Sequence, residues 1–113
     1  MSTRNFSDKQ EKYLAKITNG KITPNSGGTK FSGGDIIAEP ILLEAKTTTK
    51  IKESFSIKKD WIEKASEQAF EQGQQESVVV FQFEPDGDNY FILDEYQFLD
   101  YLEYKREINK NDN

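Results

Sequence analysis

The chain has 113 residues, 31% of them charged, and a net charge of −5, which allows one domain with one modest core. It contains no cysteine and no histidine, which excludes disulfides, Ser-His-Asp triads and zinc sites built on Cys or His. No apolar run approaches the roughly 20 residues that span a bilayer, and the first residues lack the apolar region of a signal peptide, so we expect a cytoplasmic protein without membrane contact.

The first half predicts one helix and a pair of strands. Ser7-Asp8-Lys9-Gln10 has the spacing of a capping box, an apolar stripe at helical spacing follows it, and Asn19-Gly20 ends the stripe. A short strand near residues 29–31 is a further option. The elements expected here are a helix over about 8–18, an exposed loop over 19–34, strands over about 34–38 and 41–46, and a polar loop over 47–56.

The second half predicts a helix, a hairpin and a last helix. Ser56 is the expected N-cap of the first of these helices and Gly73 its stop, and Asp94 is the expected cap of the last helix. The expected elements are a helix over about 57–72, strands over 77–83 and 90–93 with a turn at 85–89, and a helix over about 95–107. Four aromatic residues are expected in the core: Trp61, Phe70, Phe81 and Phe83.

The element order α-β-β-α-β-β-α predicts an α/β sandwich with a mixed sheet. We expect a single domain over residues 1–113, with frayed tails at 1–6 and 108–113. The last helix is apolar on more than one face. One face would pack on the sheet, and the remainder would form the interface of a homodimer.

Asp35, Glu44 and Lys46 form the candidate site. Side chains alternate along a strand, so Glu44 and Lys46 point the same way, and a bend of two or four residues pairs Asp35 with Glu44. Adjacent carboxylates repel each other unless a cation lies between them. Oxygen ligands favour a hard ion such as Mg²⁺, which leaves room for a phosphate. The pattern indicates metal-assisted hydrolysis of a phosphodiester, with Lys46 orienting or deprotonating the attacking water.

These residues also have purely structural interpretations. Asp35 could occupy a turn after glycines, and Glu44, which has apolar neighbours, could be ion-paired with Lys46. The Gly/Ser-rich loop could be a plain linker, or its N–H groups could cradle phosphate. Asp86-Gly87-Asp88 is similar to part of a calcium loop, but the closing Glu is missing, so we expect a hairpin turn.

Taken together, the helix with a Glu, the Gly/Ser-rich loop, Gly34-Asp35 and Glu44-Ala45-Lys46 resemble the PD-(D/E)xK nuclease superfamily. Within it, the chain is most similar to Holliday junction resolvases of the archaeal and phage type, over about residues 7–93. The resemblance implies a restriction-endonuclease-like sandwich, Mg²⁺ as cofactor with Mn²⁺ able to substitute, and a four-way DNA junction as substrate in a bacterial or phage-infected cell. Symmetric cutting of two strands requires two active sites, which a homodimer would supply.

The resemblance further implies a role for each matching residue. Asp35 and Glu44 would be metal ligands, helped by the Ala45 carbonyl, and Glu11 would complete the metal site. Lys46 would position or activate the attacking water. The residues expected to contact DNA or line the site are Ser26, Thr29, Lys30, Lys50, Lys52, Lys58 and Gln68.

The charge is divided unevenly along the chain. Residues 1–64 carry 12 basic and 8 acidic side chains, whereas residues 65–113 carry 3 basic and 12 acidic ones. A basic surface beside Lys46 favours contact with DNA. The acidic half keeps two alternatives open: a nuclease of the same fold with other branched, nicked or duplex substrates, and a non-catalytic protein that binds or mimics DNA.

Overall fold

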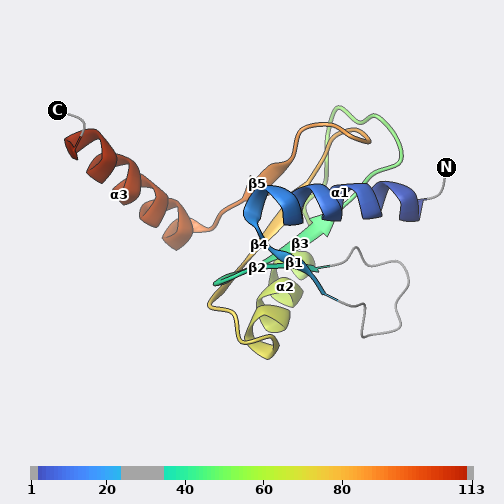
Figure 1. The fold of residues 1–113 in the computed structure, drawn as a ribbon. Helices are drawn as coiled ribbons and strands as arrows, with labels where there is room; N and C mark the ends of the chain where they lie inside the picture. The colour runs from blue at the N-terminus through green and yellow to red at the C-terminus, as the bar shows by residue number, and fades with distance from the viewer. Residues whose placement is uncertain (1–2, 24–34, 112–113) are drawn as a thin grey trace.

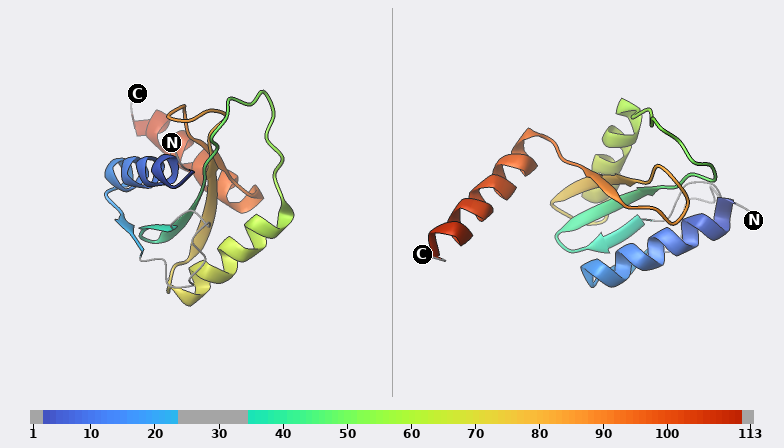
Figure 2. Two further views of the ribbon diagram at one scale, coloured as in Figure 1. Left: turned by 90° about the vertical axis from the view of Figure 1, so that its right-hand side faces the viewer. Right: turned by 90° about the horizontal axis from the view of Figure 1, so that it is seen from above.

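The computed structural model describes residues 3–23 and 35–111, which form one five-stranded mixed sheet and three helices (Figure 1). Its elements are α1 (Thr3–Thr18), β1 (Lys21–Ile22), β2 (Asp35–Ala38), β3 (Ile41–Lys46), α2 (Lys59–Glu71), β4 (Glu76–Phe81), β5 (Tyr90–Ile92) and α3 (Glu95–Asn111). Helices α1 and α2 cover opposite faces of the sheet (Figure 2). The α/β class and the mixed sheet are therefore confirmed.

The strands lie in the order β1-β2-β3-β4-β5. Strands β3 and β4 are parallel, and the other neighbours are antiparallel. A parallel pair needs a long crossover, and the segment that contains α2 supplies it. The central strands β3 and β4 are the most apolar, as expected for strands covered on both faces.

Alternation along the central strands sorts their side chains onto two faces. Leu43 and Ala45 of β3 pack with Leu14 of α1, and Ile36, Val78 and Val80 complete this core cluster. Glu44 and Lys46 lie one residue out of phase, so they point to the opposite face, which α2 covers. The sheet therefore presents an apolar face to α1 and a partly polar face to α2.

The helix ends follow the expected stop signals. Asn19 adopts a left-handed conformation (φ 54°), and the Gly20 N–H donates to the Ala15 carbonyl at 2.8 Å. A side chain at Gly20 would meet the Ile37 carbonyl oxygen at 2.7 Å, so only glycine lets the chain turn this closely onto β2. Gly73 (φ 74°) ends α2 in the same way, with Gln74 N–H bonded to Ala69.

Two expected helix starts are wrong. Helix α1 begins at Thr3 rather than near residue 8, and Ser7 lies inside it, donating to a Glu11 oxygen at 2.6 Å. Helix α2 begins at Lys59, and its N-cap is Lys58 rather than Ser56, without a side-chain capping bond. Asp94 does cap α3: its carboxylate accepts from Gln97 N–H, and its own N–H donates to the Gln97 side chain, both at 2.9 Å.

Other boundaries differ more modestly. Residues 3–6 and 108–111, which are expected to be frayed tails, belong to α1 and α3. The expected loop after α1 contains β1 at its start, and the optional strand at 29–31 lies outside the described residues. Phe70 was expected in the core but is 86% exposed. In the described part of the chain, no helix is long and apolar enough to cross a membrane.

Helix α3 projects from the rest of the molecule (Figure 1), and the whole structure, α3 included, extends over 50 × 33 × 27 Å. It is tied to the sheet near its start, where the Gln97 amide donates to Glu76 and to the Ser77 carbonyl, both at 2.9 Å. It contains no buried residue. The expectation that one of its faces packs on the sheet is therefore wrong.

Candidate functional site

The candidate site begins with the pairing of β2 and β3. Ala38 lies opposite Ile41, so the bend contains two residues, 39 and 40, and Asp35 lies opposite Glu44. Directly opposed residues on an antiparallel pair have neighbouring side chains. The predicted register is confirmed, and it places the two carboxylates on the face of the sheet that α2 covers.

Gln68 of α2 connects the two acids. In the amide orientation that suits its surroundings, its nitrogen donates to Asp35 Oδ2 at 3.2 Å and to Glu44 Oε2 at 3.1 Å. Gln68 therefore lies beside both acids, and its role at the site stays a prediction. One neutral amide bridging two carboxylates fixes their separation but supplies no positive charge.

The positive charge comes from Lys46. Its Nζ lies 3.5 Å from Glu44 Oε1 and 4.7 Å from the centre of the Trp61 ring. The Lys46 side chain is only 23% exposed, so the ring and the carboxylate hold the ammonium group in place. Asp35, Glu44, Lys46 and Gln68 therefore form one connected polar cluster, called the acidic-pair site below.

Burial next to a second acid changes the ionisation of Glu44. Desolvation, followed by its hydrogen bond to Asp35 and the charge of that carboxylate, raises the pKa of Glu44 to about 9, and Lys46 offsets this only in part. Without a cation, Glu44 therefore keeps a proton at neutral pH. A bound divalent ion would displace that proton, because it favours the charged form of both acids.

The residues present fit a hard divalent ion. Asp35 Oδ1 is buried and has no hydrogen-bond partner among the residues that the structure describes, and a buried oxygen without a partner is costly. Two carboxylates are enough for Mg²⁺, which commonly keeps several waters and binds phosphate oxygens. Asp35 and Glu44 would hold the ion, and the Ala45 carbonyl stays a predicted further ligand.

Glu11 stands apart from this pair. It lies on α1, which packs on the opposite face of the sheet, and it is 8% exposed, accepting the bond from Ser7. Within residues 3–23 and 35–111, no group of three or more acidic side chains is arranged to share a metal. Its role as a third ligand stays a prediction.

The residues expected to contact DNA divide into two sets. Ser26, Thr29 and Lys30 lie outside the described residues. Lys50, Lys52 and Lys58 are exposed along the segment that follows β3 and leads into α2, the green loop in Figure 1. Lys52 is partly fixed, because its N–H donates to the Phe83 carbonyl at 2.8 Å and its ammonium group lies 5.2 Å from the Phe55 ring centre.

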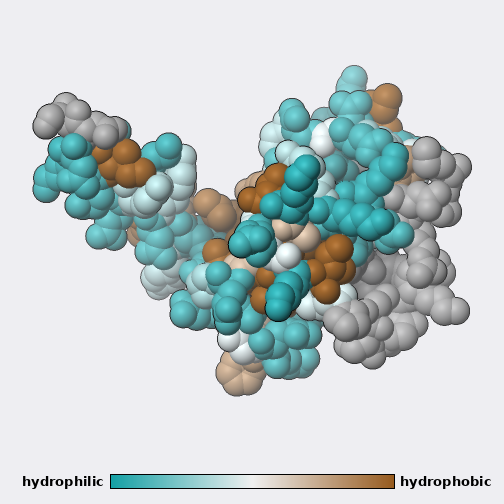
Figure 3. Space-filling model, in the orientation of Figure 1, coloured by the Kyte–Doolittle hydropathy of each residue, from teal (hydrophilic) through white to brown (hydrophobic). Residues whose placement is uncertain are grey.

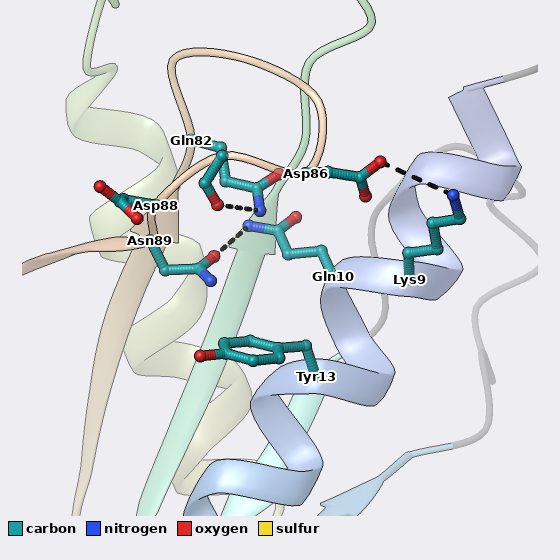
Figure 4. A pocket seen from close by; sticks show the side chains of 8 residues that line it. Lys9, Gln10, Tyr13, Gln82, Asp86, Asp88 and Asn89 are labelled. Carbon is teal, nitrogen blue, oxygen red and sulfur yellow. Dashed lines mark hydrogen bonds and ion pairs between the residues drawn. The ribbon is translucent and has the colours of Figure 1, made fainter.

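A separate hollow of about 410 Å³ lies between α1 and the turn at 85–89 (Figure 4). The Gln10 amide donates to Asn89 at 3.2 Å and to the Lys46 carbonyl at 3.3 Å, and Lys9 pairs with Asp86 at 3.6 Å. Neither Asp35 nor Glu44 lines this hollow. It joins α1 to the end of β3 and to the hairpin, and it is distinct from the acidic-pair site.

The comparisons with known proteins identify no relative. No protein-family model matches the chain, and no curated protein or solved structure is similar enough to match it. The function must therefore be inferred from the acidic-pair site itself.

Trp61 is the residue of this site that the sequence-based prediction missed, since it was assigned only to the core. It is half-buried and also contacts Phe55, with ring centres 5.9 Å apart. Trp61 and Gln68 are seven residues apart on α2 and thus share one helical face. That spacing, together with the expected role of Gln68, could have placed Trp61 beside the acids.

Proposed function

We propose that this chain is a Mg²⁺-dependent endonuclease with a restriction-endonuclease-like fold. It would hydrolyse DNA phosphodiesters, with the four-way junction as its preferred substrate. The observation that carries the proposal is the direct pairing of Asp35 with Glu44 beside a half-buried Lys46. Two carboxylates and one amine on adjacent strands suit metal-assisted attack on a phosphate better than any nucleophile that this chain could supply without Cys or His. The resemblance to the PD-(D/E)xK superfamily supports the junction as substrate.

In this proposal each side chain has a distinct task. Asp35 and Glu44 hold the cation, which when bound would polarise the scissile phosphate and stabilise the departing oxygen. Lys46, held between Glu44 and the Trp61 ring, directs a hydrogen bond or a proton transfer at the attacking water. Gln68 keeps the two acids at the separation that the cation needs. The products would carry 5′-phosphate and 3′-hydroxyl ends.

Contact with DNA would come from basic residues of the segment that links β3 to α2. Lys50, Lys52 and Lys58 lie in the segment between β3 and α2, so a phosphate backbone that reaches Lys46 could follow them. Acidic residues dominate the later part of the chain, which restricts the DNA path to this side. A homodimer would supply two such sites for symmetric cleavage, and a cytoplasmic location would give the protein access to DNA.

A cleavage assay tests the proposal. A labelled synthetic four-way junction, a linear duplex and a single strand are each incubated with the protein, with Mg²⁺ or with EDTA. We expect Mg²⁺-dependent cleavage of the junction, with the other two substrates cut less. Cleavage of all three would retain the nuclease and refute the junction preference.

Two variants give the assay its control. Asp35→Asn should abolish cleavage, because it removes one charge from the cation site while preserving the shape of the side chain. Asp88→Asn, in the exposed turn of the separate hollow, makes the same chemical change and should cleave like the wild type. Binding of DNA without any cleavage, or full activity in Asp35→Asn, would contradict the proposal.

A further inference from the structure

Helix α3 and strand β5 carry many exposed apolar side chains. On α3, Tyr96, Phe98, Leu99, Tyr101 and Tyr104 are between 49% and 77% exposed, and on β5 and just after it Tyr90, Phe91 and Leu93 are between 41% and 47% exposed. Successive residues of β5 point to opposite faces of the sheet, and the exposed residues of α3 lie around the helix, so these side chains do not form one surface. Phe98, Leu99, Tyr101 and the half-buried Leu102 share one side of α3, because they are related by spacings of three and four residues. These four side chains are called the arm surface. Figure 3 shows brown, hydrophobic patches on the projecting helix among teal, hydrophilic ones.

The size of the arm surface fits a specific interface. Taking roughly 200 Å² for a fully exposed side chain of this size, Phe98, Leu99 and Tyr101, each about half exposed, together expose on the order of 300 Å². Monomeric proteins seldom expose an apolar patch above about 300–600 Å². A partner in an interface of standard size contributes about 800 Å², so the arm surface would form the apolar centre of such an interface, with the charged residues of α3 around it.

The charges on α3 indicate what covers it. Residues 95–104 contain the three acidic side chains Glu95, Asp100 and Glu103 and no basic one. Residues 105–111 contain the three basic side chains Lys105, Arg106 and Lys110, and one acidic residue. An antiparallel copy of the same helix would place acidic half against basic half at both ends, whereas a parallel copy would place like charges together.

We propose that α3 pairs antiparallel with the α3 of a second copy of this chain, around a two-fold axis. Such an axis makes the interface self-complementary, so one charge pattern satisfies both copies. Because α3 projects from the sheet and contains no buried residue, it can meet its copy without rearrangement of the core. The inference does not depend on the nuclease proposal, since it uses none of the residues of the acidic-pair site.

Sedimentation velocity at micromolar concentration tests the existence of the interface. We expect the wild type to sediment as a dimer and the double variant Leu99→Glu/Leu102→Glu to sediment as a monomer with an unchanged circular dichroism spectrum. Phe70→Glu is the matched control, because Phe70 is an exposed apolar residue (86%) on α2, and it should remain dimeric. A monomeric wild type, or a dimer unaffected by the double variant, would overturn the inference.

Cysteine cross-linking tests the orientation, because the chain has no cysteine of its own. Glu95→Cys and Lys110→Cys are prepared separately, mixed under reducing conditions and then oxidised. The antiparallel pair predicts a cross-link between the two variants in the mixture and none in either variant alone. Cross-linking within each variant alone would show a parallel pair and refute the proposed arrangement.

Discussion

Replacing Glu44 with glutamine should stabilise the metal-free protein at neutral pH. In the folded chain the pKa of Glu44 is raised to about 9, against 4.5 for the unperturbed group. Between these two values the folded chain holds a proton that the unfolded chain does not. The free energy of unfolding is therefore greatest below pH 4.5 and falls as the pH rises through this window.

The size of the stability change follows from the difference between the pH and the pKa of Glu44 in the unfolded chain. Each pH unit above that pKa is worth about 1.4 kcal/mol. At pH 7, keeping Glu44 protonated therefore lowers the free energy of unfolding by about 3 kcal/mol. Glutamine carries no charge in either state and can still donate a hydrogen bond to Asp35. We therefore expect Glu44→Gln to unfold with a free energy higher by about 3 kcal/mol at pH 7, and close to that of the wild type at pH 4.5.

Urea denaturation in EDTA at pH 4.5, 6 and 8 measures this difference. The matched control is Glu63→Gln, which makes the same change at an exposed position on α2, and its pH dependence should follow that of the wild type. The reasoning would be refuted if Glu44→Gln were no more stable than the wild type at pH 8, or if the difference between them did not grow with pH.

Three further predictions concern other residues. Lys46→Met should lower the rate of cleavage by about 10²–10⁴-fold while leaving binding of Mn²⁺ intact, as followed by single-turnover kinetics and metal titration; an unchanged rate would remove Lys46 from the chemistry. Gln68→Leu should lower the free energy of unfolding by about 1–3 kcal/mol, because Asp35 and Glu44 lose their shared donor, and urea denaturation would detect this. Leu14→Ala, at a fully buried core position, should cost about 2–5 kcal/mol in the same measurement, and a smaller loss would show that the core collapses around it.

Features set by near neighbours in the sequence were predicted well. The alternation of apolar and polar residues along β3, with a short bend before it, was enough to predict that Asp35 lies opposite Glu44. Asn19-Gly20 and Gly73 ended their helices because left-handed backbone geometry at these points depends on the local residue type. Asp94 capped α3 for the same local reason.

Features that depend on distant packing were predicted less well. Ser7 and Ser56 are good capping residues, but the helices start elsewhere, because the caps add little compared with the packing of a helix on the sheet. Phe70 is apolar, yet it points to solvent, since the face of α2 that meets the sheet is already taken by Ala65 and Ala69. The position of Glu11 likewise depends on which face of the sheet α1 covers.

Binding of Mn²⁺ followed by electron paramagnetic resonance tests the central claim most directly, because the signal of the free ion disappears when the ion is bound. We expect the wild-type chain to bind the ion, with release of protons as Glu44 ionises, and Asp35→Asn to bind it much more weakly. Undiminished signal from the free ion in the presence of excess wild-type protein, or equal binding by Asp35→Asn, would contradict a metal site at Asp35 and Glu44.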